Sequence, residues 1–268
     1  MNRRQQGHSG RKPSRRAKEP QLFKKNDLLY GFHPVCEALR AGRRDIHKLY
    51  ISQSRKPSRA SRLQNLAEEK NIPVETMAVE TLDKMTRSAN HQGIALAAGS
   101  LPLPKAGDVI PMINARSDPS FILVLEGIED PNNMGALIRT ALCHGVDDIL
   151  VPKDRCAGLS PAVSKSSAGA MEHASIFSIT NTASILKSLK DSGIWVFGLD
   201  ADSETMLFDA DLTGGIALVI GGEHKGIRPG VKKECDFLLS IPNKGRINSL
   251  NASVAGGIAM YEALRQRG

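Results

Sequence analysis

Short apolar runs that alternate with helical patterns constrain the fold of this chain more than any other feature of its sequence. Each run is four to six residues long, and most are followed by apolar residues at helical spacing. The runs occupy residues 121–125, 148–151, 175–179, 194–199, 216–220 and 237–241. Strands that are apolar on both faces are typical of a mostly parallel sheet covered by helices. We therefore predict an α/β domain over residues 119–268.

The region before this domain has a similar but shorter pattern. A helical spacing of apolar residues at Val35, Ala38 and Leu39 is followed by a strand pattern at 48–51. A second helix is expected over 60–70, followed by an apolar alternation at 72–77. We predict a small α/β domain over residues 26–100. Residues 101–119 contain four prolines and little periodicity, which predicts a linker over 101–118.

The excess positive charge of the chain lies at its N-terminal end. Residues 1–25 contain nine lysines and arginines against the single acidic residue Glu19, and the remaining 27 basic and 27 acidic residues cancel. A segment so poor in large apolar residues cannot offset the entropy lost on ordering, so we predict a disordered basic tail. Contact with phosphates and a merely solubilising extension are both compatible with this composition.

Other compositional features exclude several classes of protein. No stretch approaches the roughly 18 uninterrupted apolar residues of a membrane-spanning helix, and residues 1–25 lack the apolar segment of a secretory signal. We therefore expect a cytoplasmic protein. The cysteines show neither a C-x-x-C pair nor a metal-ligand spacing with histidine, which argues against a disulfide framework or a metal site. They are Cys36, Cys143, Cys156 and Cys235.

Three polar or glycine-rich segments follow strands of the larger domain, where ligands of parallel sheets usually bind. The first, residues 126–141, is a strand end, a turn and a helix start that places Asn133 near the helix N-terminus. Arg139 lies six residues further on and therefore not on the same helix face. If both residues serve one site, the turn folds back or a second subunit contributes. Taken alone, the segment is better explained by a capped helix that carries an exposed arginine. The expected buried stripe of this helix is Met134, Leu137, Ile138, Ala141 and Leu142.

The second segment, residues 217–227, is a buried strand that runs into a glycine-rich turn with one carboxylate, Glu223. Its glycines would let the backbone approach a ligand closely. The Gly-Lys-Ser/Thr ending of a phosphate loop is absent, and no Gly-x-Gly-x-x-Gly occurs in the chain. An ordinary tight turn and a binding loop both fit this segment, and we interpret His224 as a loop residue.

The third segment, residues 241–255, is a polar loop followed by a helix of small residues. Either Ser249 or Asn251 is suited to cap this helix, which should continue through Ile258 and Leu264. A capped helix that packs closely on its neighbours would explain the segment without any catalytic role.

Together, the three segments resemble the three motifs of the SpoU family, also called TrmH-like RNA 2'-O-ribose methyltransferases, in the same order and at similar spacing. Residues 30–35 and 91–94 resemble the N-terminal domain of the branch that modifies a guanosine of large-subunit (23S) ribosomal RNA. Residues 166–170 also resemble a family segment. Departures from the family pattern at His224, Lys225 and Ala252 remove no functional group.

This resemblance implies a fold, a cofactor and a site. The larger domain is then a SPOUT-type α/β domain with a deep trefoil knot, an exception to the rule that chains avoid knots. The implied cofactor, S-adenosyl-L-methionine, is held in the knot by Gly221, Ile241 and Leu250. The residues that match the family's catalytic positions are Asn133, Arg139, Glu223, Ser249 and Asn251. The family is homodimeric, which would reconcile the positions of Asn133 and Arg139.

The implied reaction transfers a methyl group to a ribose 2'-hydroxyl, which must lose its proton because a neutral hydroxyl is a weak nucleophile. The family proposal makes the arginine that matches Arg139 the base, although a free guanidinium keeps its proton up to a pKa above about 12. Two versions stay open: Arg139 as a base assisted by an RNA phosphate, or as a cation that stabilises the developing alkoxide. Asn133 and Asn251 would orient substrate or cofactor, and Glu223 would position these side chains.

The N-terminal domain resembles L30-like RNA-binding modules and implies structured RNA as the partner. Its basic side chains are expected to contact phosphates, which position RNA without discriminating its sequence. They are Arg40, Arg43, Arg44, Arg55, Lys56, Arg59 and Arg62. The alternatives are a tRNA 2'-O-methyltransferase and a non-catalytic RNA-binding protein of ribosome assembly. The five intact catalytic matches disfavour the second, and the extra N-terminal domain favours ribosomal RNA.

Overall fold

The computed structural model describes residues 28–54, 57–246 and 249–268. The basic tail predicted over residues 1–25 lies outside these residues. Within the described ranges, no helix is long and apolar enough to cross a membrane.

The N-terminal part is a mixed sheet covered by helices on both faces. The strand order is β1-β4-β2-β3, in which β4 is antiparallel to β1 and β2, and β2 is parallel to β3. Ile94 and Leu96 pack beneath α1 and α2, whereas Ala95 and Ala97 point to the face that α3 covers. The elements are β1 (Leu28–Tyr30), α1 (Phe32–Ala41), β2 (Ile46–Ser52), α2 (Pro57–Glu69), β3 (Val74–Met77), α3 (Val79–Thr86) and β4 (Ile94–Ala98).

The predicted linker contains a short helix. After a 3-10 turn η1 (Ala106–Asp108), α4 (Val109–Asn114) packs Val109 and Ile113 into the core beneath the second sheet. These two residues are four apart and therefore share one face of the helix. Pro111 lies in the first turn, where its missing N–H has no intrahelical partner to lose. The proline content of this segment therefore did not prevent a helix.

The C-terminal part is the parallel α/β sheet that the sequence predicts. Its strand order is β10-β8-β9-β5-β6-β7, and each neighbouring pair is parallel. Each of the apolar runs overlaps one of these strands. The elements are β5 (Phe121–Glu126), α5 (Pro131–Cys143), β6 (Asp148–Pro152), α6 (Pro161–Ser166), η2 (Ala170–Glu172), β7 (Ile176–Ile179), α7 (Thr182–Asp191), β8 (Trp195–Leu199), η3 (Leu207–Asp209), β9 (Ile216–Gly221), α8 (Pro229–Lys232), β10 (Phe237–Leu239) and α9 (Ala252–Arg267).

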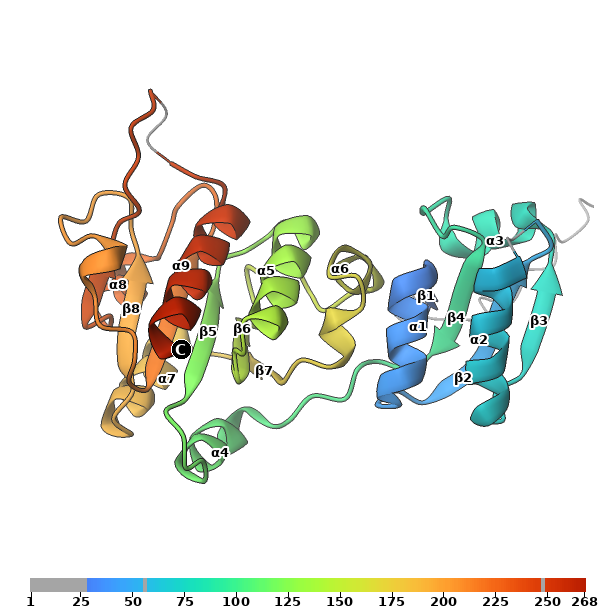
Figure 1. The fold of residues 1–268 in the computed structure, drawn as a ribbon, viewed down its shortest axis with the longest axis horizontal. Coiled ribbons are helices and arrows are strands. Elements are labelled where there is room, and N and C mark those ends of the chain that lie inside the picture. Colours follow the sequence, from blue (N-terminus) through green and yellow to red (C-terminus); the bar gives the residue numbers. More distant parts are fainter. Residues whose placement is uncertain (1–27, 55–56, 247–248) are drawn as a thin grey trace, which may run out of the picture.

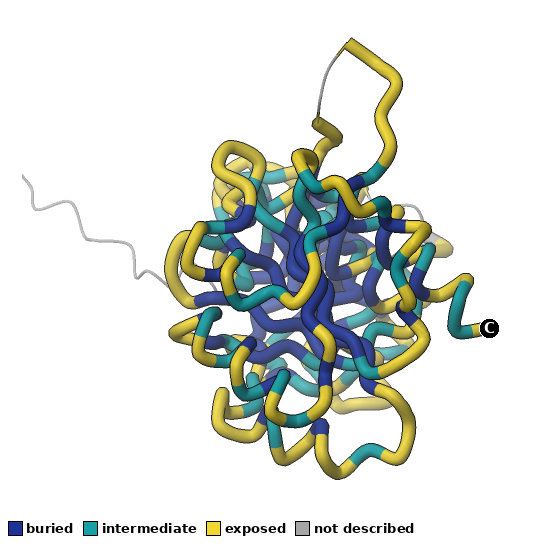
Figure 2. The backbone as a smooth tube through the Cα atoms, turned by 90° about the vertical axis from the view of Figure 1, so that its left-hand side faces the viewer, coloured by how far each residue is buried: buried dark blue, intermediate teal, exposed yellow. Residues whose placement is uncertain are grey.

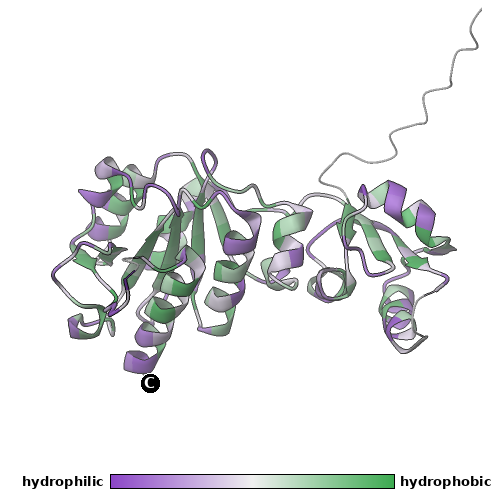
Figure 3. Ribbon diagram, turned by 90° about the horizontal axis from the view of Figure 1, so that it is seen from above, coloured by the Kyte–Doolittle hydropathy of each residue, from purple (hydrophilic) through white to green (hydrophobic). Residues whose placement is uncertain are grey.

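Helices cover both faces of this sheet, and its strands form the apolar middle layer (Figures 1 and 3). On one face, Leu137 of α5 and Ala259 of α9 pack over Leu123 of β5. On the other face, Leu186 of α7 packs over Val124. Buried residues are concentrated in the middle of the molecule, and exposed ones in the loops around it (Figure 2). The loops therefore surround the carboxyl ends of the strands.

Helix α5 begins as predicted but buries a narrower stripe. Asp130 caps it by accepting a hydrogen bond from the backbone N–H of Asn132 at 3.1 Å, and Pro131 is its first residue. The expected burial of Leu142 is wrong, because this side chain is 40% exposed. On an ideal helix, Leu142 lies roughly 80° from Met134, on the side of Arg139. The edge of the stripe therefore faces solvent.

Candidate active site

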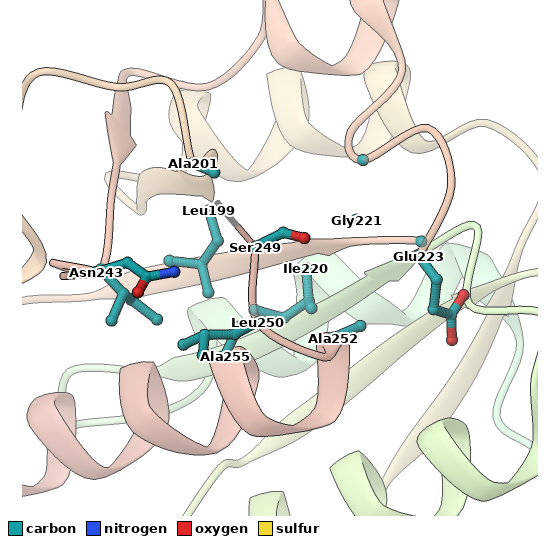
Figure 4. A pocket seen from close by; sticks show the side chains of 13 residues that line it. Leu199, Ala201, Ile220, Gly221, Glu223, Asn243, Ser249, Leu250, Ala252 and Ala255 are labelled. Carbon is teal, nitrogen blue, oxygen red and sulfur yellow. The ribbon is translucent and has the colours of Figure 1, made fainter. Parts of the chain in front are cut away.

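A pocket lies at the carboxyl edge of the sheet, where three chain segments meet (Figure 4). The segments follow β8, β9 and β10, and the last of them continues into α9. The three residues predicted to hold the cofactor, Gly221, Ile241 and Leu250, all line this pocket, and so do Glu223 and Ser249. The lining residues are Leu199, Ala201, Ile220, Gly221, Gly222, Glu223, Gly226, Ile241, Asn243, Ser249, Leu250, Ala252 and Ala255.

A chain of hydrogen bonds links Glu223, which lines the pocket, to side chains of the segments that follow β5 and β10. Asn133 is 9% exposed, and its Nδ2 donates to Oε1 of Glu223 at 2.5 Å. Its Oδ1 accepts a hydrogen bond from Nδ2 of Asn251 at 3.1 Å. One donor and one acceptor of the Asn133 amide are thereby used, which fixes the orientation of that amide. The fold therefore brings together polar side chains that lie far apart in the sequence.

Asn251, rather than Ser249, caps helix α9. Its Oδ1 accepts hydrogen bonds from the backbone N–H of Ser253 at 2.9 Å and of Val254 at 3.4 Å. Because the oxygen is occupied by the cap, the amide nitrogen is directed to Asn133. Ser249 instead lines the pocket. The cap thus serves both the helix and the geometry of the site.

Two glycines of the second segment lie so close to other parts of the backbone that no side chain fits there. A Cβ on Gly221 would lie 2.3 Å from the carbonyl carbon of Gly226, and one on Gly222 would lie 2.0 Å from the carbonyl oxygen of Gly127. The structure shows close approach of the backbone at Gly226 and at Gly127. Gly221 and Gly222 also line the pocket, so close approach to a ligand stays a prediction. This tight turn sets the position of Glu223, the residue that follows.

A buried carboxylate that the sequence analysis did not single out supports this turn. Glu126 ends the central strand β5 and is 1% exposed. Its Oε2 accepts a hydrogen bond from the Thr182 hydroxyl at 2.7 Å, and its Oε1 forms an ion pair with Arg228. The hydrogen bond to Glu126 raises the pKa of the Arg228 guanidinium. The far end of the glycine-rich turn is thereby bound to the central strand. The sequence pattern that could have indicated Glu126 is an acidic residue directly after an apolar run.

Arg139 is not brought to the other candidate residues within one chain. It is exposed on α5, and it is not among the residues that line the pocket. Within the part of the chain that the structure describes, its guanidinium makes no hydrogen bond or ion pair. Arg139 and Asn133 therefore lie on different faces of α5, as their spacing in the sequence predicts.

The segment after β8 also contributes to the pocket, and the sequence analysis missed it. Leu199 ends the strand, and Ala201 lies in the turn that follows. Lys232 of α8 forms an ion pair with Asp200 between them. Its position at the carboxyl end of a predicted strand could have indicated that it contributes to a binding site.

The basic side chains of the N-terminal part have two different environments. Arg59 and Arg62 lie over the ring of Phe32, with guanidinium carbons 5.1 and 5.9 Å from its centroid. Arg40 forms an exposed ion pair with Glu37 at 2.8 Å. The prediction that Arg44 contacts phosphates is wrong, because it is 7% exposed and its guanidinium is bound inside the protein.

Arg43 is likewise occupied, because its guanidinium donates to backbone carbonyl oxygens, including that of Ala174 at 2.8 Å. The fold therefore turns both of these arginines inward, toward the C-terminal part of the chain. The remaining two predicted phosphate contacts, Arg55 and Lys56, lie outside the described residues.

Comparison with known proteins identifies the family. Residues 120–261 match the model of the SpoU rRNA Methylase family, which covers more than half of the chain. The chain belongs to this SpoU family. Residues 28–103 match the model described as RNA 2'-O ribose methyltransferase substrate binding. We call residues 28–103 the substrate-binding region and residues 120–261 the methylase region.

Members of the SpoU family resemble this chain over almost its whole length. The protein named 23S rRNA (guanosine-2'-O-)-methyltransferase RlmB in Shewanella oneidensis is 36% identical over 91% of this chain and 99% of its own. The protein of the same name in Nitrosomonas europaea is 37% identical over 90% of this chain and 92% of its own. The resemblance inferred from the three segments is thereby confirmed.

A solved structure shares the fold. The SpoU methyltransferase AviRb from Streptomyces viridochromogenes, crystallised in complex with the cofactor AdoMet, aligns with a TM-score of 0.76. The alignment covers 91% of each chain at 22% sequence identity. Both regions of this chain therefore have the architecture of a known methyltransferase.

Proposed function

We propose that this protein transfers the methyl group of S-adenosyl-L-methionine to the ribose 2'-hydroxyl of a guanosine in 23S ribosomal RNA. The hydrogen-bonded chain Glu223–Asn133–Asn251 at the rim of the pocket carries this proposal. Polar groups fixed in this way beside a ligand pocket provide the orientation that methyl transfer requires. The names of the SpoU relatives supply the substrate class.

The lining of the pocket fits the proposed cofactor. Apolar walls from Leu199, Ile241 and Leu250 suit a planar purine ring, whereas Glu223 and Ser249 offer polar groups to the ribose and amino-acid parts. Gly221, Ile241 and Leu250 would hold the cofactor there. When bound, it supplies an electrophilic methyl group on a sulfonium.

The protein residues then have the remaining tasks. Asn133 and Asn251 would orient the reacting groups through their amides, and Ser249 would contact them from the pocket wall. Glu223, whose Oε1 accepts the short hydrogen bond from the Asn133 amide, would hold Asn133 in place. Arg139 would either remove the proton of the 2'-hydroxyl with help from an RNA phosphate, or stabilise the alkoxide as a cation.

The pH dependence of methyl transfer by Arg139→Lys separates these two roles. A lysine is a cation of lower pKa, so a base role predicts a profile displaced to lower pH, whereas a cationic role predicts residual activity with the normal profile. Single-turnover rates measured between neutral and alkaline pH provide the test.

A homodimer would complete the site. Val254, Ile258 and Tyr261 form an apolar stripe along the outer face of α9 and are 50%, 40% and 59% exposed. Leu142 and Arg139 lie on the exposed side of the neighbouring helix α5, to which the His144–Tyr261 ring contact joins α9. An exposed apolar surface of this kind is typical of an interface between subunits. A second copy packed on it would bring its own Arg139 toward the pocket, whose wall includes Ala252 and Ala255 of α9.

Two finer features of the fold also belong to this proposal. We propose that the segments after β8, β9 and β10, which surround the pocket, form the deep trefoil knot of SPOUT domains, and that the substrate-binding region is L30-like. An experimental structure that traces residues 199–251 tests the knot directly. Since the proposed substrate is ribosomal RNA, we place the protein in the cytoplasm.

Mapping of 2'-O-methylation in cells with and without this protein tests the function. Loss of one methylated guanosine in 23S rRNA on deletion, and its return with the intact gene, would support the proposal. Loss of a methylated nucleotide in tRNA would assign the alternative substrate. Unchanged methylation of both RNAs would favour a non-catalytic role in ribosome assembly.

A further inference from the structure

A fully buried ion pair connects the substrate-binding region to the methylase region. Glu172 of η2 is 0% exposed, and its Oε2 accepts a hydrogen bond from Nε of Arg44 at 2.7 Å. Its Oε1 accepts from Nη2 of Arg44 at 3.0 Å and from the Ser164 hydroxyl at 2.9 Å. The guanidinium and the carboxylate thus form a two-pronged contact, the geometry that holds both groups in one orientation.

Backbone groups of both regions complete this contact. Nη1 of Arg44 donates to the carbonyl oxygen of Gly99 at 3.0 Å. Arg43 donates to the carbonyl oxygens of Glu172 at 3.2 Å, Ala174 at 2.8 Å and Pro102 at 3.2 Å. The two arginines therefore bind the end of β4, the start of the connecting segment and the η2 turn at once.

Residues 166–170 resemble a family segment and have no role assigned so far. They pack against α1 of the substrate-binding region. Gly169 has φ +87°, and a Cβ there would lie 2.7 Å from Cβ of Glu37 on α1. His173 adds a hydrogen bond between its Nε2 and Oε2 of Glu37 at 3.0 Å. A residue larger than glycine would separate the two regions, so this turn fits against α1 (Figure 1).

The same segment packs directly on the helix that carries Asn133. A Cβ on Gly135 of α5 would lie 2.0 Å from the Ser166 hydroxyl oxygen, which shows how closely the two helices approach. The Ser166 hydroxyl also donates to the carbonyl oxygen of Pro131 at 2.7 Å. The segment formed by α6 and η2, which includes Glu172, therefore lies between Arg44 and the first turn of α5.

A buried ion pair contributes little net stability, because desolvation of both charges offsets their attraction. Its clearer effect is geometric, since a misplaced partner leaves a buried charge unpaired. Contacts between domains of one chain usually permit relative motion unless the interface is fixed. The Arg44–Glu172 pair penalises any arrangement of the two regions other than the one observed.

We propose that Arg44 and Glu172 are positioning residues, which hold the substrate-binding region at a fixed place relative to Asn133 so that bound RNA presents its target ribose to the site. This inference rests on the proposed function, because it assumes RNA as the substrate. The pair touches neither the pocket nor the exposed basic side chains Arg59 and Arg62. It should therefore act on turnover rather than on the binding of either ligand.

Glu172→Gln tests the proposal because it keeps the shape of the side chain and removes its charge. We expect unchanged S-adenosyl-L-methionine affinity by calorimetry and unchanged RNA affinity by filter binding. The kcat for RNA methylation should fall about 10- to 100-fold, the effect of misplacing a substrate by about 1 Å. Small-angle X-ray scattering should show a broader range of arrangements of the two regions. Glu75→Gln, which removes the exposed ion pair of Glu75 with Lys48, is the matched control and should match the wild type in all four measurements.

The double variant Arg44→Met/Glu172→Gln tests whether the two residues act as one pair. If the two residues act as one pair, the double variant has a kcat no lower than that of Arg44→Met alone. Wild-type kcat in Glu172→Gln, or a loss confined to RNA affinity or to cofactor affinity, would overturn the proposal. If the wild type methylates no RNA, the proposed function fails, while the scattering comparison still shows whether the pair fixes the two regions.

Discussion

The side-chain amide nitrogen of Asn133 lies 2.5 Å from Oε1 of Glu223, although 90 residues separate them in the chain. The oxygen of the same amide accepts a hydrogen bond from Asn251, the cap of α9. A rotation of the Asn133 amide by 180° would place like groups opposite each other at both contacts. The site is therefore preorganised by the protein alone, with the polar atoms of three chain segments fixed beside the pocket.

Asn133→Ala should abolish most methyl transfer and leave the cofactor bound. The substitution removes the central member of the hydrogen-bonded chain, so Glu223 and Asn251 lose their fixed orientation. We expect kcat to fall about 100- to 1,000-fold, the range seen when an oriented donor of an active site is removed. Turnover measured together with S-adenosyl-L-methionine affinity by calorimetry provides the test.

Asn132→Ala is the matched control for this substitution. Asn132 occupies the same helical turn, but its side chain is exposed and bonds only to Asp130 among the described residues. It should retain nearly full turnover. Normal turnover of Asn133→Ala would remove that residue from the mechanism.

Mixed dimers should show whether Arg139 acts across the subunit interface. Arg139→Ala and Asn133→Ala are each expected to be inactive as pure proteins. In a dimer of one chain of each kind, one site would combine an intact Asn133 with the intact Arg139 of the other chain. Equal mixing should thus restore about a quarter of the wild-type activity, since half of the dimers are mixed and each has one complete site. No recovery after verified subunit exchange would place Arg139 in the site of its own chain.

Ile258→Asp should convert the proposed dimer into a monomer. A carboxylate in the middle of the exposed stripe of α9 would be buried without a partner in the interface, at a cost of several kcal/mol. The side chain is 40% exposed in the single chain, so folding of that chain should be retained. Sedimentation velocity gives the mass and circular dichroism the fold. Val74→Asp, at a residue 39% exposed on β3, is the control and should leave the mass unchanged.

Gly222→Ala should disrupt the cofactor pocket, because the added methyl group would collide with the carbonyl oxygen of Gly127. A collision with backbone cannot be relieved by a side-chain rotation, so we expect a loss of about 2 kcal/mol in the free energy of unfolding. The affinity for S-adenosyl-L-methionine should fall as well. Gly214→Ala, where the added Cβ meets nothing within 4 Å, should leave both quantities unchanged. Thermal unfolding and calorimetry measure the two effects, and equal behaviour of the two variants would contradict the interpretation of Gly222.

The parallel sheet was predictable because its signal is local. Strands buried on both faces must be apolar throughout, so a run such as 216–220 predicts β9 without knowledge of its neighbours. The helix caps were partly predictable for the same reason, since Ser249 and Asn251 both precede a helical pattern. Only the tertiary structure decided between them, because the amide nitrogen of Asn251 donates a hydrogen bond to Asn133, which lies far away in the sequence.

The sequence alone therefore determined the strands, most of the helices and the residue types of the site. The tertiary structure decided which of those residues meet. Local spacing specifies secondary structure, whereas the order of the strands brings the ends of β5 and β9 together at one edge. The same reason explains the error on Arg44: a basic residue in a basic region looks solvent-exposed, and its buried partner Glu172 lies 128 residues away. For Arg139 the sequence was sufficient. Helix geometry separates it from Asn133, and the two remain separated in the folded single chain.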